Sequence, residues 1–448
     1  MSEERNGGGR RETLFGDGLA VGPDLEDAAQ RAVRQAVGPL DGPPALVCVF
    51  VSGAAPDDAV RAGLRAMAVA ADAGGDGTTV LGCTASGVMG GGRGVEGEGA
   101  VSAWATALPG IQLTPFRLDT AHTPDSVLVT GMPAPSPDDR VALLLADPFR
   151  FPVDAFVQHS ADELGGLPIT GGLAASATPA GPATPGAAAS PAAAASPPEV
   201  ASPAGGAAAG QAAQAGGGPG SGVKLFLDGE VHQGGAVGVL LGGPLEVATV
   251  VSQGCRPVGP TMVVTGAAGN QVTELAGTQA LVKLDEIVGG LPDEERKLAA
   301  SGIHLGIAID EYAEEHDRGD FLVRPVIDAD PDTGTMTVGE IVEVGQTVRF
   351  QVRDAATAAA DLERLLRVFG PVSGIDPVGG ALLFSCNGRG TSLFGSPGHD
   401  VAAVRRALEP EAAGGFFASG EIGPVGGRNH VHGYTASILV FGRAGGTT

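Results

Sequence analysis

The chain has 448 residues, of which 43% are apolar, and it carries a formal net charge of −24 at pH 7. This length suffices for two or three domains with cores of their own, and the apolar content excludes a chain that is disordered throughout. The negative charge disfavours binding to nucleic acids and to anionic membranes, because like charges repel.

The N-terminal residues and the cysteines indicate the compartment. Residues 1–12 are charged, lack the apolar segment of a secretion signal and are expected to form a disordered tail. The chain contains no run of about 18 apolar residues that could span a membrane. The four cysteines, Cys48, Cys83, Cys255 and Cys386, stand singly, which is typical of thiols in a reducing cytosol. We therefore expect a soluble cytoplasmic protein.

Helical and extended patterns alternate through the first part of the chain. The run VALLLA at 141–146 is apolar throughout, which predicts a central strand that is covered on both faces. Helices are predicted at 23–37, 57–71 and 153–164, and further strands at 45–52, 78–84, 101–108 and 111–118.

Residues 174–222 consist almost entirely of Ala, Gly, Pro, Ser and Thr. Proline recurs too often for a helix and apolar side chains are too few for a core, so the segment is predicted to be a disordered insertion. Strands are expected on both sides, at 167–173 and 223–228. We therefore interpret the segment as an enlarged hairpin loop within a domain.

The second part of the chain is similarly mixed. Asp354 is well placed to cap a helix at 355–369 that has an apolar stripe. The other expected helices are at 273–288 and 399–408, and the expected strands are at 235–243, 245–254, 303–309, 321–327, 334–338, 347–352, 381–385, 415–419 and 432–441. The order predicts an α/β to α+β fold in which mixed β-sheets are layered with helices, in two halves of related size.

The segment FSCNGRGTSLFGSPGHD, residues 384–400, is the densest group of functional side chains. Its glycines at 388 and 390 let the backbone approach a ligand closely. Arg389 offers a planar fork of donors that suits a carboxylate or phosphate, and Asn387 offers both a donor and an acceptor. The alternative is an ordinary tight turn with Arg389 solvated or paired structurally.

A second polar segment, GEIGPVGGRNHVHG at 420–433, contains a carboxylate between glycines. Glu421 could receive an amino group while Arg389 holds a carboxylate, which is the arrangement that an amino-acid binder needs. Alternatively, Glu421 and Arg389 pair with each other. Asn429 and His432 are the remaining candidate pocket groups in this segment.

The histidines and thiols leave other chemistries open. His430 and His432 share one face of an extended segment, and with His399 or Cys386 they could hold a metal, although His432 as a hydrogen-bonding pocket or core residue fits as well. Cys386 could act as a nucleophile with His399 or His432 as its base. Cys83 and Cys255, which also follow strands in Gly-containing turns, either pack in the core or line the same cleft.

These two segments, with the stretch GIAIDEYAEEHDRGDFLVRPVIDADPDTGTMTVGEIVEVGQTVRFQVRDA before them, resemble the C-terminal half of FIST domains. The segments ALVCVFVSG, TTVLGCTASGV, LPITGGLAAS and VVSQGCRPVGP resemble the N-terminal half. The resemblance implies a FIST N-terminal domain at 13–260, with the insertion at 174–222, and a FIST C-terminal domain at 261–443.

The resemblance also implies a sensory protein for small molecules such as amino acids. We expect a stand-alone cytoplasmic sensor that binds a small polar ligand and signals in trans to a partner protein, without binding nucleic acid or membrane. The expected ligand-binding residues are Cys386, Asn387, Arg389, Glu421, Asn429 and His432. No cofactor or metal is predicted, although a branch of the family is associated with haem, which here would be non-covalent. The alternatives are a thiol- or metal-dependent hydrolase that uses Cys386 and His432, and a protein-interaction scaffold.

Overall fold

The computed structural model describes residues 12–122, 127–177, 222–313, 316 and 318–443, and the statements below concern these residues. Nearly all of the predicted tail at 1–12 and most of the predicted insertion at 174–222 lie outside them. The first residues assigned to the insertion do not fit that assignment, because Ala174, Ala175 and Ala177 are buried. The backbone of Ala174 bonds to Ala146, and that of Ala175 to Thr84.

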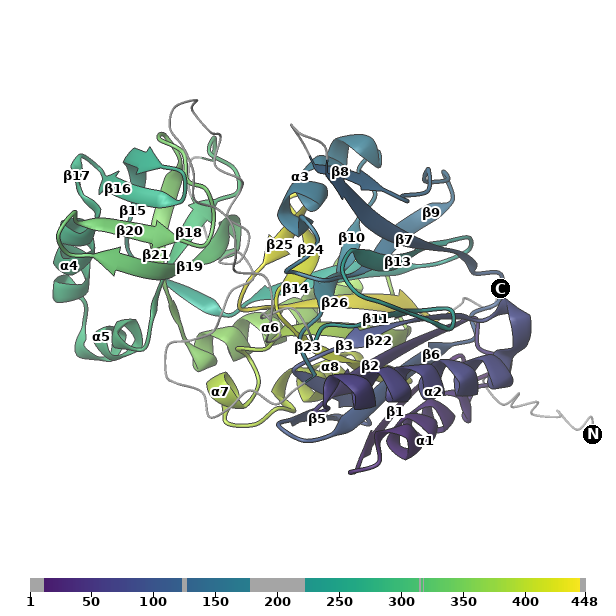
Figure 1. Cartoon of the computed structure of the whole chain (residues 1–448). Helices are drawn as coiled ribbons and strands as arrows, with labels where there is room; N and C mark the ends of the chain where they lie inside the picture. The colour runs from purple at the N-terminus through teal and green to yellow at the C-terminus, as the bar shows by residue number, and fades with distance from the viewer. Residues whose placement is uncertain (1–11, 123–126, 178–221, 314–315, 317, 444–448) are drawn as a thin grey trace, which may run out of the picture.

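The body of the molecule contains three mixed sheets (Figure 1). The strands of the first sheet are, in spatial order, β1 (Phe15–Val21), β6 (Ala100–Thr106), β2 (Leu46–Ser52), β3 (Thr79–Thr84), β11 (Leu225–Leu227) and β12 (Glu230–His232). Those of the second sheet are β14 (Val247–Gln253), β26 (Thr435–Gly442), β22 (Val378–Cys386), β23 (Ala412–Ala418), β4 (Gly87–Gly90) and β5 (Arg93–Glu96). Those of the third sheet are β25 (Arg428–His432), β24 (Glu421–Val425), β10 (Ile169–Leu173), β9 (Asp139–Ala146), β13 (Ala236–Gly242), β7 (Gln112–His122) and β8 (Val127–Thr130).

The three sheets share one central core that is rich in aromatic rings. Trp104 packs against Phe15 and Phe441, with ring centroids 5.7 and 5.1 Å apart, and Phe50 packs on Phe416 at 4.7 Å. Helices cover the outer faces: α1 (Leu25–Val37) and α2 (Pro56–Gly74) lie on the first sheet, α6 (Ala355–Ser373) and α8 (His399–Leu408) on the second, and α3 (Val153–Glu163) on the third. The expected fold class, mixed sheets layered with helices, is confirmed, and the run VALLLA lies in β9, a central strand.

Gly380 marks a place where this core has no room for a side chain. A Cβ atom there would lie 2.4 Å from Phe15 Cδ1 and 2.9 Å from Trp104 Cζ2. We expect Gly380→Ala to lower the free energy of unfolding by about 1–3 kcal/mol, because overpacking forces neighbouring rings to shift. Urea denaturation measures the loss. Gly289→Ala, on a helix position with nothing within 4 Å of the added atom, is the matched control.

The first and second sheets repeat one topology. The order β1-β6-β2-β3 corresponds to β14-β26-β22-β23, and in both sheets the last two strands are parallel while the other neighbours are antiparallel. Both β3 and β23 lead into the tripeptide Ala-Ser-Gly, at 85–87 and 418–420, which precedes or opens a hairpin. The body is therefore built from two copies of one α/β unit.

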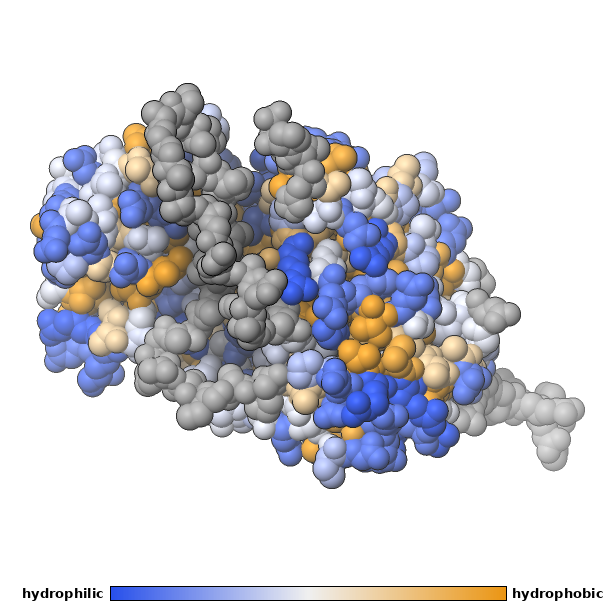
Figure 2. All heavy atoms as spheres, viewed as in Figure 1, coloured by the Kyte–Doolittle hydropathy of each residue, from blue (hydrophilic) through white to orange (hydrophobic). Residues whose placement is uncertain are grey.

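A closed barrel is inserted into the second copy, between β14 and α6. Its six strands pair in the order β15 (Cys255–Ala268), β21 (Thr347–Arg353), β18 (Ile303–Ala308), β19 (Phe321–Asp330), β20 (Thr335–Val338) and β16 (Gln271–Leu275), and β16 pairs back to β15. The short strand β17 (Thr278–Gln279) and the helices α4 (Ala280–Gly290) and α5 (Asp293–Ala300) accompany it. Figure 1 shows the barrel as a separate lobe beside the body, and Figure 2 shows that hydrophilic residues cover much of both on the face in view.

Three expectations about elements were wrong. The strands β10 and β11, on either side of the insertion, lie in different sheets, so the insertion does not join a hairpin. The helix expected at 273–288 begins at Ala280, because Ala276 and Gly277 adopt positive φ angles of 48° and 74° and separate β16 from α4. The strand expected at 432–441 begins only at Thr435, the start of β26, because Tyr434, with a φ of 62°, separates it from β25, which ends at His432.

Candidate functional site

The polar residues of both quoted segments meet at one edge of the second sheet. β22 and β23 are parallel, so their carboxyl ends lie at the same edge, where ligands bind in open α/β sheets. β22 ends at Cys386 and is followed by the turn that holds Arg389, while β23 is followed by Glu421 at the start of β24. The two segments, 420–433 and 384–400, are thus brought together by strand pairing.

Arg389 forms a buried ion pair with Asp400 at the start of α8. Its Nε lies 2.8 Å from Asp400 Oδ2 and its Nη2 lies 3.0 Å from Oδ1, and the two side chains are 1% and 3% exposed. Ser385 Oγ donates to the same carboxylate at 2.6 Å, and His399 Nδ1 lies 3.0 Å away. Burial acts to raise the pKa of Asp400, but the charge of Arg389 and these hydrogen bonds outweigh it and hold the pKa well below its usual range. Arg389 is therefore paired structurally through two of its three nitrogens.

The third nitrogen of Arg389 is left without a partner. Nη1 is buried and makes no hydrogen bond among the described residues. It faces Gly254, where an added Cβ would lie 3.1 Å from it. One charged donor atom of a fully buried guanidinium is thus available to another molecule.

Glu421 is fully buried, and only one of its two carboxylate oxygens has a hydrogen-bond partner among the described residues. Its Oε2 accepts hydrogen bonds from Thr435 N at 3.1 Å and Thr435 Oγ1 at 2.7 Å, while Oε1 has no partner among the described residues. Burial raises the pKa of Glu421 to about 8, against the lowering effects of the Thr435 hydrogen bonds and the charge of Arg389. Arg389 and Glu421 are thus close enough to interact, yet within the described part of the chain they form no ion pair at 4.0 Å or less.

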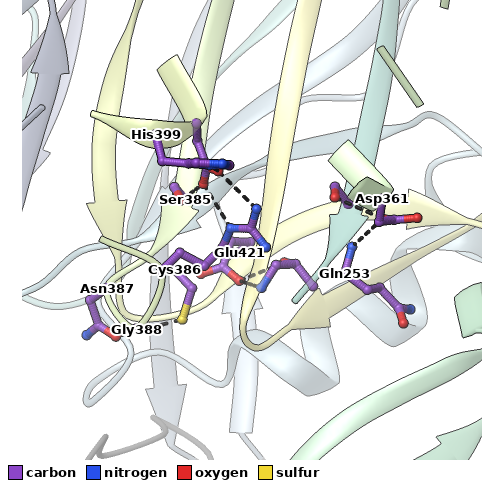
Figure 3. A network of polar contacts seen from close by, with 12 residues as sticks. Gln253, Asp361, Ser385, Cys386, Asn387, Gly388, His399 and Glu421 are labelled. Atoms are coloured by element: carbon purple, nitrogen blue, oxygen red, sulfur yellow. Dashed lines mark hydrogen bonds and ion pairs between the residues drawn. The ribbon is translucent and has the colours of Figure 1, made fainter. Parts of the chain in front are cut away.

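Cys386 lies beside Glu421 with its thiol buried. Its Sγ lies 3.8 Å from Asn387 Oδ1, and it packs in a small cluster with Cys255, Val323 and Tyr434. Burial, and next the charge of Glu421, raises the pKa of the Cys386 thiol. A catalytic thiol needs a lowered pKa, so these surroundings favour a lining residue over a nucleophile. Figure 3 shows Cys386 and Glu421 side by side, with the amide oxygen of Asn387 directed at the sulfur of Cys386.

The side chain of Asn429 forms its hydrogen bonds with the third sheet and with α3, the helix that covers it. Its Oδ1 accepts from Ile169 N at 2.9 Å, and its Nδ2 donates to Ser160 Oγ at 3.1 Å and to Leu167 O at 3.0 Å. These bonds tie α3 and the start of β10 to β25. The side chain has no amide hydrogen left for a ligand.

Asn429→Ala is expected to lower the free energy of unfolding by about 3 kcal/mol. The substitution leaves the polar groups of Ser160, Leu167 and Ile169 buried without this partner. Urea denaturation, with hydrogen exchange at α3, measures the effect. Arg428→Ala, at the exposed neighbouring position, serves as the control, and equal stability of both variants would contradict the assignment.

His432 faces Glu421 across the β24–β25 hairpin but bonds to the backbone. Its Nε2 lies 3.0 Å from Gly423 O, and burial lowers its pKa to about 3. The rings of His430 and His432 are 6.0 Å apart, whereas His399 stacks on Phe394 at 3.6 Å. In the described part of the chain no three His, Cys, Asp or Glu side chains gather as a metal site would require.

The sequence interpretation missed Asp400 and Tyr434. Asp400 stands in the quoted segment itself, in the first turn of α8, where an acidic residue is ordinary. Tyr434 is buried between β25 and β26 and contacts the barrel, with its ring 4.4 Å from that of His304. Of the two other thiols that were interpreted either as packing residues or as lining the same cleft, Cys255 packs in one small cluster with Cys386, whereas Cys83 packs in the central core.

Among the described residues, the first copy of the α/β unit has no counterpart of Arg389 or Glu421 at the corresponding edge, where the buried charged residue is Lys224, next to Thr84 at the end of β3. There β2 ends at Ser52 and is followed by Gly53, Ala54 and Ala55, and Val88 follows the Ala-Ser-Gly tripeptide where the second copy has Glu421. A shared fold therefore does not account for the buried Arg389 and Glu421. They are a property of the second copy alone.

Comparisons with known proteins identify the family to which the chain is similar. A family model of the FIST N domain matches residues 45–278, and one of the FIST C domain matches residues 280–424. An uncharacterized protein of Mycobacterium tuberculosis strain H37Rv is 37% identical over 429 residues, which cover 95% of this chain and 99% of the relative. An uncharacterized protein of Mycobacterium bovis is 35% identical over 428 residues, which cover 95% and 98%.

No helix in the described ranges has the length and hydropathy needed to cross a membrane. FIST domains are associated with sensory signal transduction. Because the two family models together match far more than half of its length, this chain belongs to the FIST family and contains both the N and the C domain.

Proposed function

We propose that the protein is a cytoplasmic sensor that binds a small zwitterion, such as an amino acid, between Arg389 and Glu421 and signals to a partner protein in trans. One observation carries the proposal: Arg389 Nη1 and Glu421 Oε1 are both buried without hydrogen-bond partners among the described residues, and the two side chains are close enough to influence each other electrostatically. A buried polar atom without a partner costs about 1–3 kcal/mol, so two in one place indicate that something else satisfies them.

Arg389 Nη1 and Glu421 Oε1 suit ligand groups of opposite charge. Arg389 Nη1 donates a charge-assisted hydrogen bond to a ligand carboxylate. Glu421 Oε1 accepts from a ligand ammonium, and the thiol of Cys386 lies beside the same carboxylate. Because burial raises the pKa of Glu421 to about 8, its carboxyl is protonated at neutral pH and releases this proton when an ammonium group binds.

Asn429 and His432 form hydrogen bonds with other groups of the protein and are not among the proposed ligand contacts. No cofactor or haem is required for this binding. The acidic chain disfavours nucleic acid or an anionic membrane as the partner, so the proposed partner is a protein.

Calorimetric titration with each of the twenty common amino acids tests the proposal. At least one is expected to bind, and Glu421→Gln is expected to weaken that binding at least about tenfold, since the neutral amide cannot pair with an ammonium group. The matched control is Glu363→Gln, on the exposed face of α6. Binding that is equal in the wild type and in Glu421→Gln, or no binding of any amino acid, would refute the proposed function.

A further inference from the structure

The barrel is attached to the body through two single residues that lie next to each other. Gly254 alone separates β14 from β15, and Asp354 alone separates β21 from α6. The strand ends beyond them are paired, Cys255 with Arg353, and Arg256 Nε lies 3.3 Å from Asp354 Oδ2. Two adjacent one-residue connections form a hinge, about which a rigid barrel can rotate.

One outer face of the barrel is buried against the body. His304 and Gln351 are opposite each other on β18 and β21 and alternate with Leu305 and Phe350, which fill the barrel core. The two polar residues therefore point out of the barrel, yet both are buried. On the body side, Gln253 Nε2 donates to the barrel carbonyls of Phe321 at 2.9 Å and Gly319 at 3.3 Å.

The contacts between the barrel and the body lie next to the site that contains Arg389 and Glu421. The Tyr434 ring lies between the barrel and the site, with the guanidinium of Arg353 5.3 Å from its centre. Arg353 also donates to Gly388 O in the site's own turn. Gly254 lies between Tyr434 O and Arg389 Nη1, since an added Cβ would be 2.2 Å from the first and 3.1 Å from the second. The unpartnered donor of Arg389 thus faces the hinge itself.

On the face of the barrel that packs against the body, some buried polar atoms lack a hydrogen-bond partner among the described residues. Within the described ranges, His304 Nδ1 and Gln351 Nε2 are buried without hydrogen-bond partners. The apolar cluster at this junction has four residues, Cys255, Val323, Cys386 and Tyr434, whereas the cores of the body and of the barrel are far larger. Little apolar contact and unpaired polar atoms make this junction less stable than either lobe.

We propose that the barrel is a hinged lid, which rotates about Gly254 and Asp354 to admit the ligand and closes over it through Tyr434. Arg389 and Glu421 are both buried while the barrel is docked, and Gly254 beside Arg389 Nη1 belongs to the connection to the barrel, so a ligand enters when the barrel lifts. A ligand that satisfies Arg389 Nη1 beside the hinge stabilises the closed position. The ligand half of this inference rests on the proposed function, whereas the opening of the barrel does not.

The reaction rates of the four native thiols can show whether the barrel opens, and this measurement needs no ligand. All four are buried, but Cys255 and Cys386 lie at the junction, whereas Cys48 and Cys83 lie in the central core. An aromatic disulfide reagent converts each exposed thiolate to a mixed disulfide and releases one aromatic thiolate. Mass spectrometry of the peptides then gives the rate at each cysteine.

We expect Cys255 and Cys386 to react together, at a rate that low urea concentrations change little, because opening exposes little surface. Cys48 and Cys83 are expected to react only with global unfolding. Gln253→Met removes the hydrogen bonds to Phe321 O and Gly319 O. It should therefore increase the reaction rate of Cys255 and Cys386 about tenfold and leave the rate of the two core cysteines unchanged. Gln158→Met, at an exposed position of α3, is the matched control.

One common rate for all four thiols that follows global unfolding would overturn the hinged lid, even if amino acids bind. An amino acid that binds by calorimetry is expected to slow Cys255 and Cys386 selectively, and a bound amino acid that leaves their rates unchanged would overturn closure on the ligand. If no amino acid binds while the two pairs of thiols separate, the proposed ligand is wrong and the hinge is supported.

Discussion

Asp400→Asn is expected to lower the free energy of unfolding by about 3–5 kcal/mol, which is the usual cost of removing one partner from a buried ion pair. The Arg389 guanidinium is buried and both of its bonds to protein side chains end on Asp400. Without that carboxylate a charge remains in an apolar interior, and the single oxygen of the Asn amide cannot accept from Ser385 and from both guanidinium nitrogens as the carboxylate does. The effect should exceed that of ordinary core substitutions.

Urea denaturation measures this loss, with Asp58→Asn as the control because Asp58 pairs with Arg61 on the surface. Replacing both partners, Arg389→Met with Asp400→Leu, is expected to cost less than the sum of the two single changes, since no unpaired charge remains. A loss below about 1 kcal/mol for Asp400→Asn would show that Arg389 is not held by this pair.

Glu421→Gln is expected to change how stability depends on pH. Burial raises the pKa of Glu421 from 4.5 to about 8, so the folded protein binds this proton more tightly than the unfolded chain does. The resulting stabilisation is fully present below pH 4.5 and is lost as the pH rises through 8. One proton changes the free energy of unfolding by about 1.4 kcal/mol per pH unit.

Between pH 5 and 7.5 the wild type should therefore lose stability faster than the Glu421→Gln variant, by on the order of 1 kcal/mol per pH unit. Urea denaturation at several pH values measures both slopes. The Glu363→Gln control should follow the wild type, because its side chain is exposed. Parallel curves for the wild type and Glu421→Gln would mean that Glu421 is ionised in the folded protein.

Local patterns predicted much of the fold. Asp354 caps α6 as expected, with its Oδ1 3.1 Å from Ala356 N, and the apolar run at 141–146 is the central strand β9. Closure of the barrel escaped prediction, because the pairing of β15 with β16 and β21 depends on contacts between distant residues. The helix predicted at 273–288 included the last three residues of β16, whose pairing with β20 joins residues that are distant in the sequence.

The sequence indicated which residues gather at the candidate site better than it indicated what each of them does there. Arg389, Glu421 and Cys386 do meet, because β22 and β23 are parallel and end at one edge. Asn429 is as polar as they are, but its donors and acceptor serve α3 and β10. Sequence alone does not tell which polar atoms remain unpaired after folding, since that depends on partners such as Asp400 and Thr435.

Proton release on binding tests the central claim most directly. We expect an amino acid that binds at pH 7 to displace close to one proton per site, because the pKa of Glu421 is raised to about 8. Calorimetry in two buffers with different enthalpies of ionisation measures this number. The account predicts nearly one proton for the wild type, with none from the Glu421→Gln variant. Amino-acid binding without proton release, or with equal release in the variant, would contradict a zwitterion site built from Arg389 and Glu421.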